Sequence, residues 1–193
     1  MAGTKQFDPD SALAGAIEVF RNKGFAGTSM QDLEKAMGLG RGSIYNTFGD
    51  KQALFIAALQ KYRCDNDDHL AQMLRDAPRA IDGIRFAVRT AAVHATSLEG
   101  RPGCLIGNTA MERVLHDDAS AAIVQNAMDH ATSMFTEALE RAQREGDFPQ
   151  DRDPHLTARY ILLGIQGLCL MSKATPDAKL VRGIAEEILR TLD

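Results

Sequence analysis

The sequence has 193 residues, which suffice for one mid-sized domain or for a small module joined to a larger one. Hydrophobic residues make up 45% and charged residues 25%, a globular composition that argues against a fibrous or extensively disordered protein. The net charge of −4 is unevenly distributed, because residues 1–63 carry eight Lys and Arg against six Asp and Glu, whereas residues 64–193 carry fourteen against twenty, so that only the N-terminal third is basic.

Hydrophobic residues recur with the helical period along the whole chain, and no segment shows a sustained two-residue alternation of β-branched side chains. An all-α fold is therefore expected. The first helix begins at Asp8-Pro9, where an acidic cap precedes proline, and it places Leu13, Ile17 and Phe20 on one face. Gly24 is expected to end this helix.

Two short helices follow the first. In the segment Thr28–Gln31 the Thr28 hydroxyl and the Gln31 side chain fit a capping box, which predicts a helix that begins at Ser29. Gly38 supplies the left-handed residue that ends it. A second short helix is expected over residues 41–48.

The rest of the chain is expected to form six longer helices. Asp50 can cap a helix that runs from Lys51 to about residue 74. Asp153-Pro154 and Thr175-Pro176 mark two further starts, because each is a capping residue followed by proline. The later helices are expected over residues 80–97, 104–115, 119–145, 154–173 and 176–192.

The two short helices and the glycine-containing turn at residues 38–40 have the sequence form of a helix-turn-helix, whose second helix enters the DNA major groove. If Ile44 and Phe48 face the core, the other side chains of this second helix are exposed or lie at its margins. Arg41 can then donate two hydrogen bonds to guanine, and Ser43 can bond a base from a short side chain.

Other residues near the second helix suit contacts with the DNA backbone. Gly42 lets the protein backbone approach DNA closely, and Tyr45 and Asn46 offer polar groups to phosphates. Lys51 adds a cation at a helix N-terminus, where phosphate is already favoured. Any one of these residues could also be ordinary solvated surface. The residues expected to contact DNA are Thr28, Ser29, Arg41, Gly42, Ser43, Tyr45, Asn46 and Lys51.

The segment from Ala16 to Leu59 closely resembles the DNA-binding domain of the TetR/AcrR family of repressors. The run Arg41-Gly42-Ser43-Ile44-Tyr45, together with Phe48 and Lys51, matches the family pattern in order and spacing. Asn46 departs from it, because many members have histidine there. The resemblance implies a repressor that binds pseudo-palindromic double-stranded operator DNA as a homodimer and that a small-molecule inducer releases.

The resemblance also implies a division of the chain. We expect residues 1–50 to form a three-helix helix-turn-helix domain and residues 51–193 to form a helical ligand-binding and dimerisation domain, connected by the helix that begins at about residue 51. A ligand-independent helix-turn-helix protein is one alternative, and an all-α enzyme is another. The five histidines are dispersed and no catalytic motif is present, so no enzymatic activity, cofactor or metal is expected.

The dimer interface is expected in the last two helices, as the family architecture implies. Glycines in the first of these helices would allow close approach in a four-helix bundle between two protomers. A hydrophobic core within one protomer would use the same residues. The expected set is Ile161, Leu162, Gly164, Ile165, Gly167, Leu168 and Cys169, together with Ile184, Ile188 and Leu192.

A ligand cavity is implied among the middle helices, with Phe86, Met111, Met128 and Phe135 as lining candidates, although side chains of these types are more often plain core. The segment around Cys104 resembles a Gly-Cys-Leu element found in a TetR subgroup that includes electrophile- and oxidant-responsive repressors. In the first turn of a helix, the helix dipole favours the Cys104 thiolate. Cys104 is therefore the candidate sensor, with simple burial as the alternative.

The other two cysteines are expected to be less reactive. Cys169 lies in an apolar stretch, where burial raises the pKa of a thiol, and Cys64 adjoins Asp65, whose charge disfavours thiolate. Modification of Cys104 is expected to act through the helix from about residue 51 on the separation of the two recognition helices.

The chain is expected to be a cytoplasmic protein with reduced thiols. The longest uncharged apolar stretch, Tyr160–Met171, is too short to cross a bilayer, and the first ten residues have no apolar core of a signal peptide. An odd number of cysteines without close pairing argues against a disulfide framework.

Overall fold

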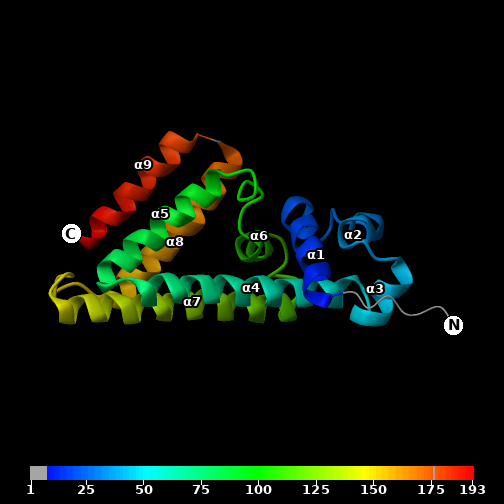
Figure 1. Ribbon diagram of the computed structural model, residues 1–193, viewed down its shortest axis with the longest axis horizontal. Helices are drawn as coiled ribbons and strands as arrows, with labels where there is room; N and C mark the ends of the chain where they lie inside the picture. Colours follow the sequence, from blue (N-terminus) through cyan, green and yellow to red (C-terminus); the bar gives the residue numbers. More distant parts are fainter. Residues whose placement is uncertain (1–7, 176) are drawn as a thin grey trace.

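The computed structural model describes residues 8–175 and 177–193 (Figure 1), and within these ranges all regular structure is helical, which confirms the all-α prediction. No helix there is both long and apolar enough to span a membrane. The helices are α1 (Pro9–Lys23), α2 (Met30–Met37), α3 (Arg41–Phe48), α4 (Lys51–Asp76), α5 (Ala80–Thr96), α6 (Leu105–Glu112), α7 (Asp118–Glu145), α8 (Pro154–Ala174) and α9 (Ala178–Leu189), and a 3-10 turn follows at Arg190–Leu192.

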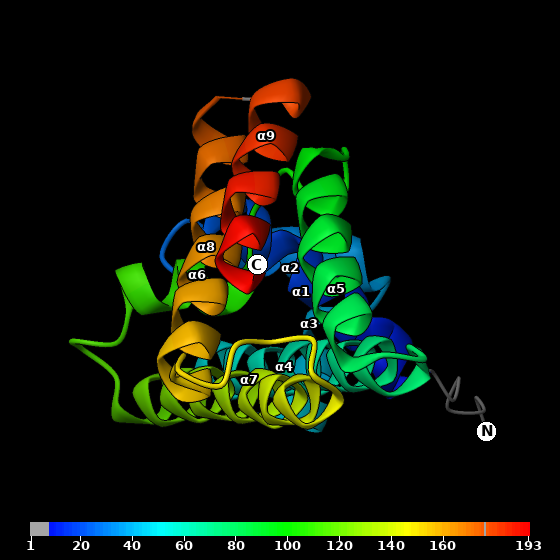
Figure 2. The same cartoon turned by 90° about the vertical axis from the view of Figure 1, so that its left-hand side faces the viewer.

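Helices α4 and α7 lie side by side along the long axis of the molecule and pack against each other (Figure 1, Figure 2). The three helices α1, α2 and α3 lie at one end of this pair, whereas α5, α8 and α9 stand together at the other end. Helix α6 lies between the two groups. The helix-turn-helix expected from the sequence therefore occupies the end of the molecule that is remote from the C-terminal helices.

Each end of the molecule has its own hydrophobic core. One core joins α1–α4 to α6 and to the first part of α7, with Phe20, Phe55 and Leu105 fully buried in it. The other joins the end of α4 to α5, to the rest of α7 and to α8 and α9, around Ile84 and Phe135. Since burial of apolar side chains is the main stabilising contribution to folding, α4 and α7, which belong to both cores, connect the ends physically.

Most of the predicted helix ends are confirmed. The Asp8 carboxylate accepts hydrogen bonds from two backbone amides of the first turn of α1, and Asp50 accepts one from the Ala53 amide at 2.8 Å. Gly38 ends α2 in the left-handed conformation, with φ of 65°. These signals act within a few residues, which is why the sequence alone located them.

Three predicted starts need correction. The capping box at α2 uses Ser29 and Asp32, not Thr28 and Gln31, because Ser29 is the residue with extended backbone before the first turn. Cys104 is the N-cap residue of α6 and precedes its first turn. Helix α9 begins at Ala178 with the Asp177 carboxylate as its cap, while Pro176 of the predicted start lies outside the described residues.

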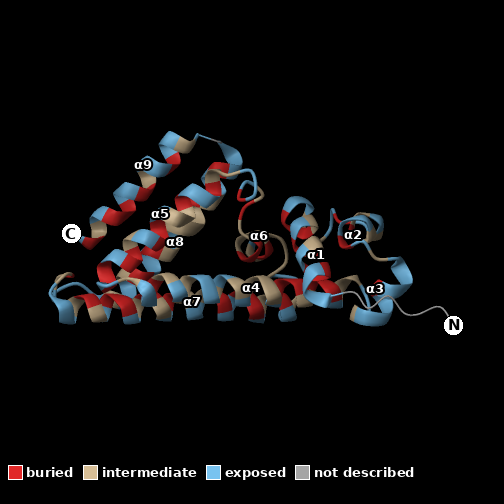
Figure 3. Ribbon diagram, viewed as in Figure 1, coloured by how far each residue is buried: buried red, intermediate tan, exposed pale blue. Residues whose placement is uncertain are grey.

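Part of the residue set expected at the dimer interface is buried inside the protomer. Ile161, Leu168 and Ile188 are nearly inaccessible to solvent within one protomer, where α5, α8 and α9 pack together (Figure 3). Leu192 is buried in the same core. A side chain on Gly164 would come within 2.6 Å of Ile188, so this glycine brings α8 close to α9 of the same protomer. The alternative of a core within one protomer is therefore correct for these residues.

Candidate nucleic-acid interface

The start of α2 is held by reciprocal hydrogen bonds between Ser29 and Asp32. The Ser29 hydroxyl oxygen accepts from the Asp32 amide at 3.2 Å, and the Asp32 carboxylate accepts from the Ser29 amide at 3.0 Å. The Lys23 ammonium at the end of α1 lies 2.6 Å from the same carboxylate. This hydrogen bond from Lys23, followed by those from Ser29, holds the pKa of Asp32 well below its ordinary value.

Thr28 lies one residue earlier and is almost fully buried, with 3% of its surface exposed. Its hydroxyl donates a hydrogen bond of 2.5 Å to the Gly24 carbonyl oxygen at the end of α1. The polar groups of Thr28 and Ser29 thus form the corner between α1 and α2. Contact between these two residues and DNA stays a prediction.

Helix α3 buries one edge and exposes the other. Ile44 is 1% exposed and belongs to the core beneath α3, as predicted. The side chain of Arg41 donates to the Tyr45 hydroxyl at 3.3 Å, and its guanidinium carbon lies 5.6 Å from the centroid of the Tyr45 ring. The exposed residues on this face are Arg41, Gly42, Ser43, Tyr45 and Asn46, in agreement with the face derived from the sequence.

Lys51, the first residue of α4, contacts a neighbouring aromatic ring. Its ammonium nitrogen lies 4.4 Å from the centroid of the Phe25 ring, in the turn between α1 and α2. The cation–π contact places the charge near the helix-turn-helix, at the N-terminus of α4. This partner could not be predicted from sequence, because Phe25 is 26 residues away in the chain.

A partly buried polar network connects the start of α4 with the α6–α7 corner. The Asp117 carboxylate accepts hydrogen bonds from Gln52 at 2.9 Å, from Arg113 at 3.1 Å and from the hydroxyl of Ser120. The bond from Ser120 is the largest of the contributions that together lower the pKa of Asp117 to about 2, against the opposing effect of burial. Asp117 is also the N-cap residue of α7, because its side chain accepts a hydrogen bond from the Ser120 amide.

The predicted sensing residues do not line one common cavity. Cys104 and Met111 border a narrow crevice of about 30 Å³ together with Gln166 and Cys169. Phe86 is exposed on α5, whereas Phe135 is 1% exposed inside the C-terminal core. Met128 packs against the other core. Residue type alone nominated these side chains, and residue type does not distinguish a core position from a cavity wall.

The three thiols have different surroundings, and those of Cys169 agree with the expectation. The Gln166 amide nitrogen lies 3.8 Å from the Cys104 sulfur, and burial raises the pKa of Cys169 to about 12, as predicted in direction. Cys64 is exposed, and its neighbour Asp65 is paired with Lys61 at 2.5 Å. The Asp65 carboxylate, which the sequence places beside Cys64, therefore already has a cation as its partner.

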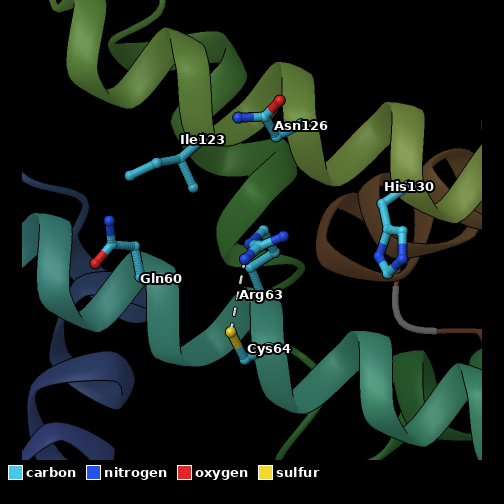
Figure 4. A pocket seen from close by; sticks show the side chains of 6 residues that line it. All are labelled: Gln60, Arg63, Cys64, Ile123, Asn126 and His130. Atoms are coloured by element: carbon cyan, nitrogen blue, oxygen red, sulfur yellow. Dashed lines mark hydrogen bonds between the residues drawn. The ribbon is translucent and has the colours of Figure 1, made fainter.

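A larger groove of about 500 Å³ lies between α4 and α7 (Figure 4). Arg63 points into it from α4, with a guanidinium nitrogen 3.7 Å from the Cys64 sulfur. Facing them, the His130 ring nitrogen lies 3.0 Å from the Asp67 carboxylate, which Arg63 also contacts. The groove holds none of the predicted sensing residues, but it makes Cys64 the accessible competitor of Cys104.

The chain is similar to known regulators along its whole length. Residues 12–58 match the family described as "Bacterial regulatory proteins, tetR family", and residues 80–188 match "Tetracyclin repressor-like, C-terminal domain". It is 30% identical to the HTH-type transcriptional regulator YezE of Bacillus subtilis over the full length of both chains. It is 28% identical to the HTH-type transcriptional repressor DhaR of Mycobacterium sp. strain GP1, covering 81% of this chain and 77% of DhaR.

Solved structures of regulators have the same fold as this chain. A cysteine mutant of the TetR family transcriptional regulator CifR, complexed with 26-base-pair operator DNA, has a TM-score of 0.88 at 27% identity, covering 99% of this chain and 100% of CifR. The reduced form of Escherichia coli NemR has a TM-score of 0.85 at 17% identity over 95% of this chain and 96% of NemR, and this likeness concerns the fold alone.

The Asp117 network predicts a pH dependence of stability. Because the pKa of Asp117 falls from 3.8 to about 2 on folding, its carboxylate stabilises the fold fully above about pH 4, and this contribution is lost as the pH falls through about 2. Urea unfolding should show a smaller loss of stability between these pH values in Asp117→Asn than in the parent. The exposed Asp151→Asn serves as the control. An equal loss in Asp117→Asn and the parent would contradict the assignment.

Proposed function

Because the chain belongs to the TetR family of bacterial regulatory proteins, we propose that it is a transcriptional repressor that binds a pseudo-palindromic operator as a homodimer and is released by a small molecule or an electrophile. The observation that carries the proposal is the exposed polar face of α3, at the free end of a helix-turn-helix that matches the family. The repressor DhaR and the operator complex of CifR support it, and these relatives are regulators rather than enzymes.

In the proposed complex α3 lies in the major groove. Arg41 at its N-terminus reads a guanine, which requires it to exchange its hydrogen bond with Tyr45 for bonds to the base. Ser43 and the unhindered backbone at Gly42 approach the base edges, while Tyr45, Asn46 and Lys51 contact phosphates. Residues 1–50 then supply DNA binding, and residues 51–193 supply dimerisation and ligand binding. The role requires a cytoplasmic protein, because bacterial operators lie there.

The proposed dimer interface is the outer face of α8 with α9, the two helices expected from the sequence, and apart from Gly167 it uses other residues than those expected. Apolar side chains on this face recur at helical spacing, and a Cβ added to Gly167 or Gly183 would meet no other part of the protomer within 4 Å beyond its own helix backbone and its two neighbours. Two such faces can pair in a four-helix bundle. The exposed apolar residues that form the face are Leu156, Tyr160, Leu163, Leu170 and Met171 on α8 and Leu180 on α9.

The proposed sensor is the crevice at the N-terminus of α6. The Cys104 thiol borders it at the N-cap position of α6, and the Gln166 amide lies 3.8 Å from its sulfur. Met111 lines the same crevice, so a small ligand that bound there would also contact α6. Phe86, Met128 and Phe135 lie elsewhere and have no part in this site.

DNA reading is tested with the duplex that the parent protein selects from a random library. Arg41→Ala should relax base preference at one position of each half-site, at a cost of about 1 to 3 kcal/mol. Lys51→Ala should weaken all sequences similarly and lower the slope of log affinity against log salt by about one phosphate contact. Binding by both variants that equals the parent on every sequence, or an absence of any selected duplex, would overturn the proposed role of α3.

The dimer interface is tested with two substitutions of leucines on α8. Leu163→Glu places a charge on the exposed face, so the protomer should stay folded while the dimer dissociates in sedimentation experiments. Leu168→Glu instead buries a charge in the protomer core and should lower the free energy of unfolding by about 3 kcal/mol or more. A Leu163→Glu protein that remains dimeric at micromolar concentration would move the interface elsewhere.

Sensing is tested by labelling with limiting N-ethylmaleimide, whose double bond accepts the cysteine sulfur while the adjacent carbon takes a proton from water. Mass spectrometry should find Cys104 labelled before Cys64 and Cys169, and labelling should release the selected duplex. Cys104→Ser should bind that duplex and resist release, whereas Cys64→Ser should respond as the parent does. Preferential labelling of Cys64, or unchanged release from Cys104→Ser, would leave a non-covalent ligand or ligand-independent binding.

A further inference from the structure

The carboxylate of Glu112, the last residue of α6, accepts hydrogen bonds from two consecutive backbone amides in the turn between α1 and α2. One oxygen lies 2.9 Å from the Phe25 nitrogen, and the other lies 2.8 Å from the Ala26 nitrogen. Bonds between a carboxylate and backbone amides are stronger than bonds between neutral groups. This turn leads directly into the helix-turn-helix, yet its partner is 86 residues away in the sequence.

The turn is shaped to admit this carboxylate. Gly24 has φ of 70°, in the left-handed region that favours glycine. A Cβ added to Gly24 would lie 2.7 Å from the nearer oxygen of Glu112. Any larger residue would therefore displace the carboxylate from the two amides. The backbone conformation and the space beside it thus both fit the bonds with Glu112.

The residue after Glu112 extends the contact to α4. The guanidinium carbon of Arg113 lies 3.9 Å from the centroid of the Phe25 ring and 5.4 Å from that of Phe55. The same guanidinium donates to the Gln52 side chain at 2.8 Å. The C-terminal end of α6 therefore contacts both the turn that precedes α2 and the first turn of α4 that follows α3.

Helices α2 and α3 join the rest of the protomer at the turn that precedes α2 and at the first turn of α4. Helix α2 packs on α1, and α3 packs on α2 and α4. In the described residues α2 and α3 make no substantial packing contact with any helix beyond α4. The orientation of α3 relative to the dimerisation helices therefore depends on how α1, its following turn and α4 are held.

We propose that Glu112 is a positioning residue for operator recognition, because its bonds to the amides of Phe25 and Ala26 fix the helix-turn-helix against α6. The inference rests on the proposed function. In a dimer, the recognition helices must meet successive major grooves about 34 Å apart, so a small rotation of each helix-turn-helix changes the preferred spacing of the half-sites. Glu112 touches no DNA in this arrangement and acts through the turn.

The test uses Glu112→Ala, which removes both acceptors, and Glu112→Gln, which keeps the shape but can accept only one of the two amide bonds well. The matched control is Glu140→Ala, because Glu140 is exposed on α7 and this substitution removes the same charge. Amide hydrogen exchange of DNA-free protein reports on Phe25 and Ala26. Affinity is measured for the duplex selected by the parent, and for the same duplex with one base pair inserted or deleted at its centre.

Both Glu112 variants should lose exchange protection at these amides, and affinity for the selected duplex should fall about tenfold in Glu112→Ala and less in Glu112→Gln. The ratio of affinities for the selected duplex and for the duplexes of altered length should also fall toward one, more in Glu112→Ala than in Glu112→Gln. Glu140→Ala should keep the parent's affinity and its spacing preference. A purely stabilising role of Glu112 would not change the spacing preference.

Three outcomes would overturn the proposal. They are unchanged affinity and spacing preference in both Glu112 variants, loss of amide protection without any change in spacing preference, and an equal loss of affinity in Glu140→Ala. Should Glu112→Ala fail to fold, the near-isosteric Glu112→Gln decides between these outcomes. A parent protein that selects no duplex would count against the proposed function, and the exchange data would still show whether Glu112 holds the turn.

Discussion

The packing of α4 against α7 is the interaction on which the rest of the structure depends. Each of these helices is long enough to enter both hydrophobic cores: α4 contributes Phe55 to one and Leu74 to the other, and α7 contributes Val124 and Leu139 in the same way. The helix-turn-helix therefore packs in one hydrophobic core with α6 and α7, which follow residue 50 in the chain. Any movement between the two ends must slide or tilt these two helices, because packed cores do not deform continuously.

Local signals in the sequence predicted the helices α1, α2 and α3 well. They failed where two residue pairs fitted the same capping motif. The residues Thr28 and Gln31 have the same spacing as Ser29 and Asp32, and each pair could form a capping box. The structure selects the second pair because Lys23, from the preceding helix, neutralises Asp32, and because the Thr28 hydroxyl is already bonded to a carbonyl oxygen of the α1 end. The first reason is a contact with the preceding helix and the second depends on how that helix ends, so the spacing within each pair could not supply them.

Helix α8 shows why the interface residues could not be assigned from sequence. Apolar side chains surround much of this helix, so its pattern does not say which face meets its own protomer. Packing against α5 and α9 decides it, and Leu168 turns inward while Leu163 and Leu170 remain exposed. The cavity residues posed the same problem in another form, since methionine and phenylalanine suit a core and a ligand site equally.

The proposed sensor and the proposed reading head are also connected at the other end of α6, by a route that the sequence did not suggest. Arg21 of α1, 6% exposed, donates to the carbonyl oxygens of Gly103 at 3.1 Å and Glu99 at 2.9 Å, and Asn108 of α6 donates back to the Arg21 carbonyl at 3.3 Å. A rearrangement of the turn before Cys104 must therefore either move α1 or leave a buried guanidinium short of acceptors. The second outcome costs about 1.5 to 3 kcal/mol for each bond lost to the charged group. That cost is comparable to the few kcal/mol that separate binding from non-binding populations, so the proposed sensing at Cys104 is expected to act by moving α1.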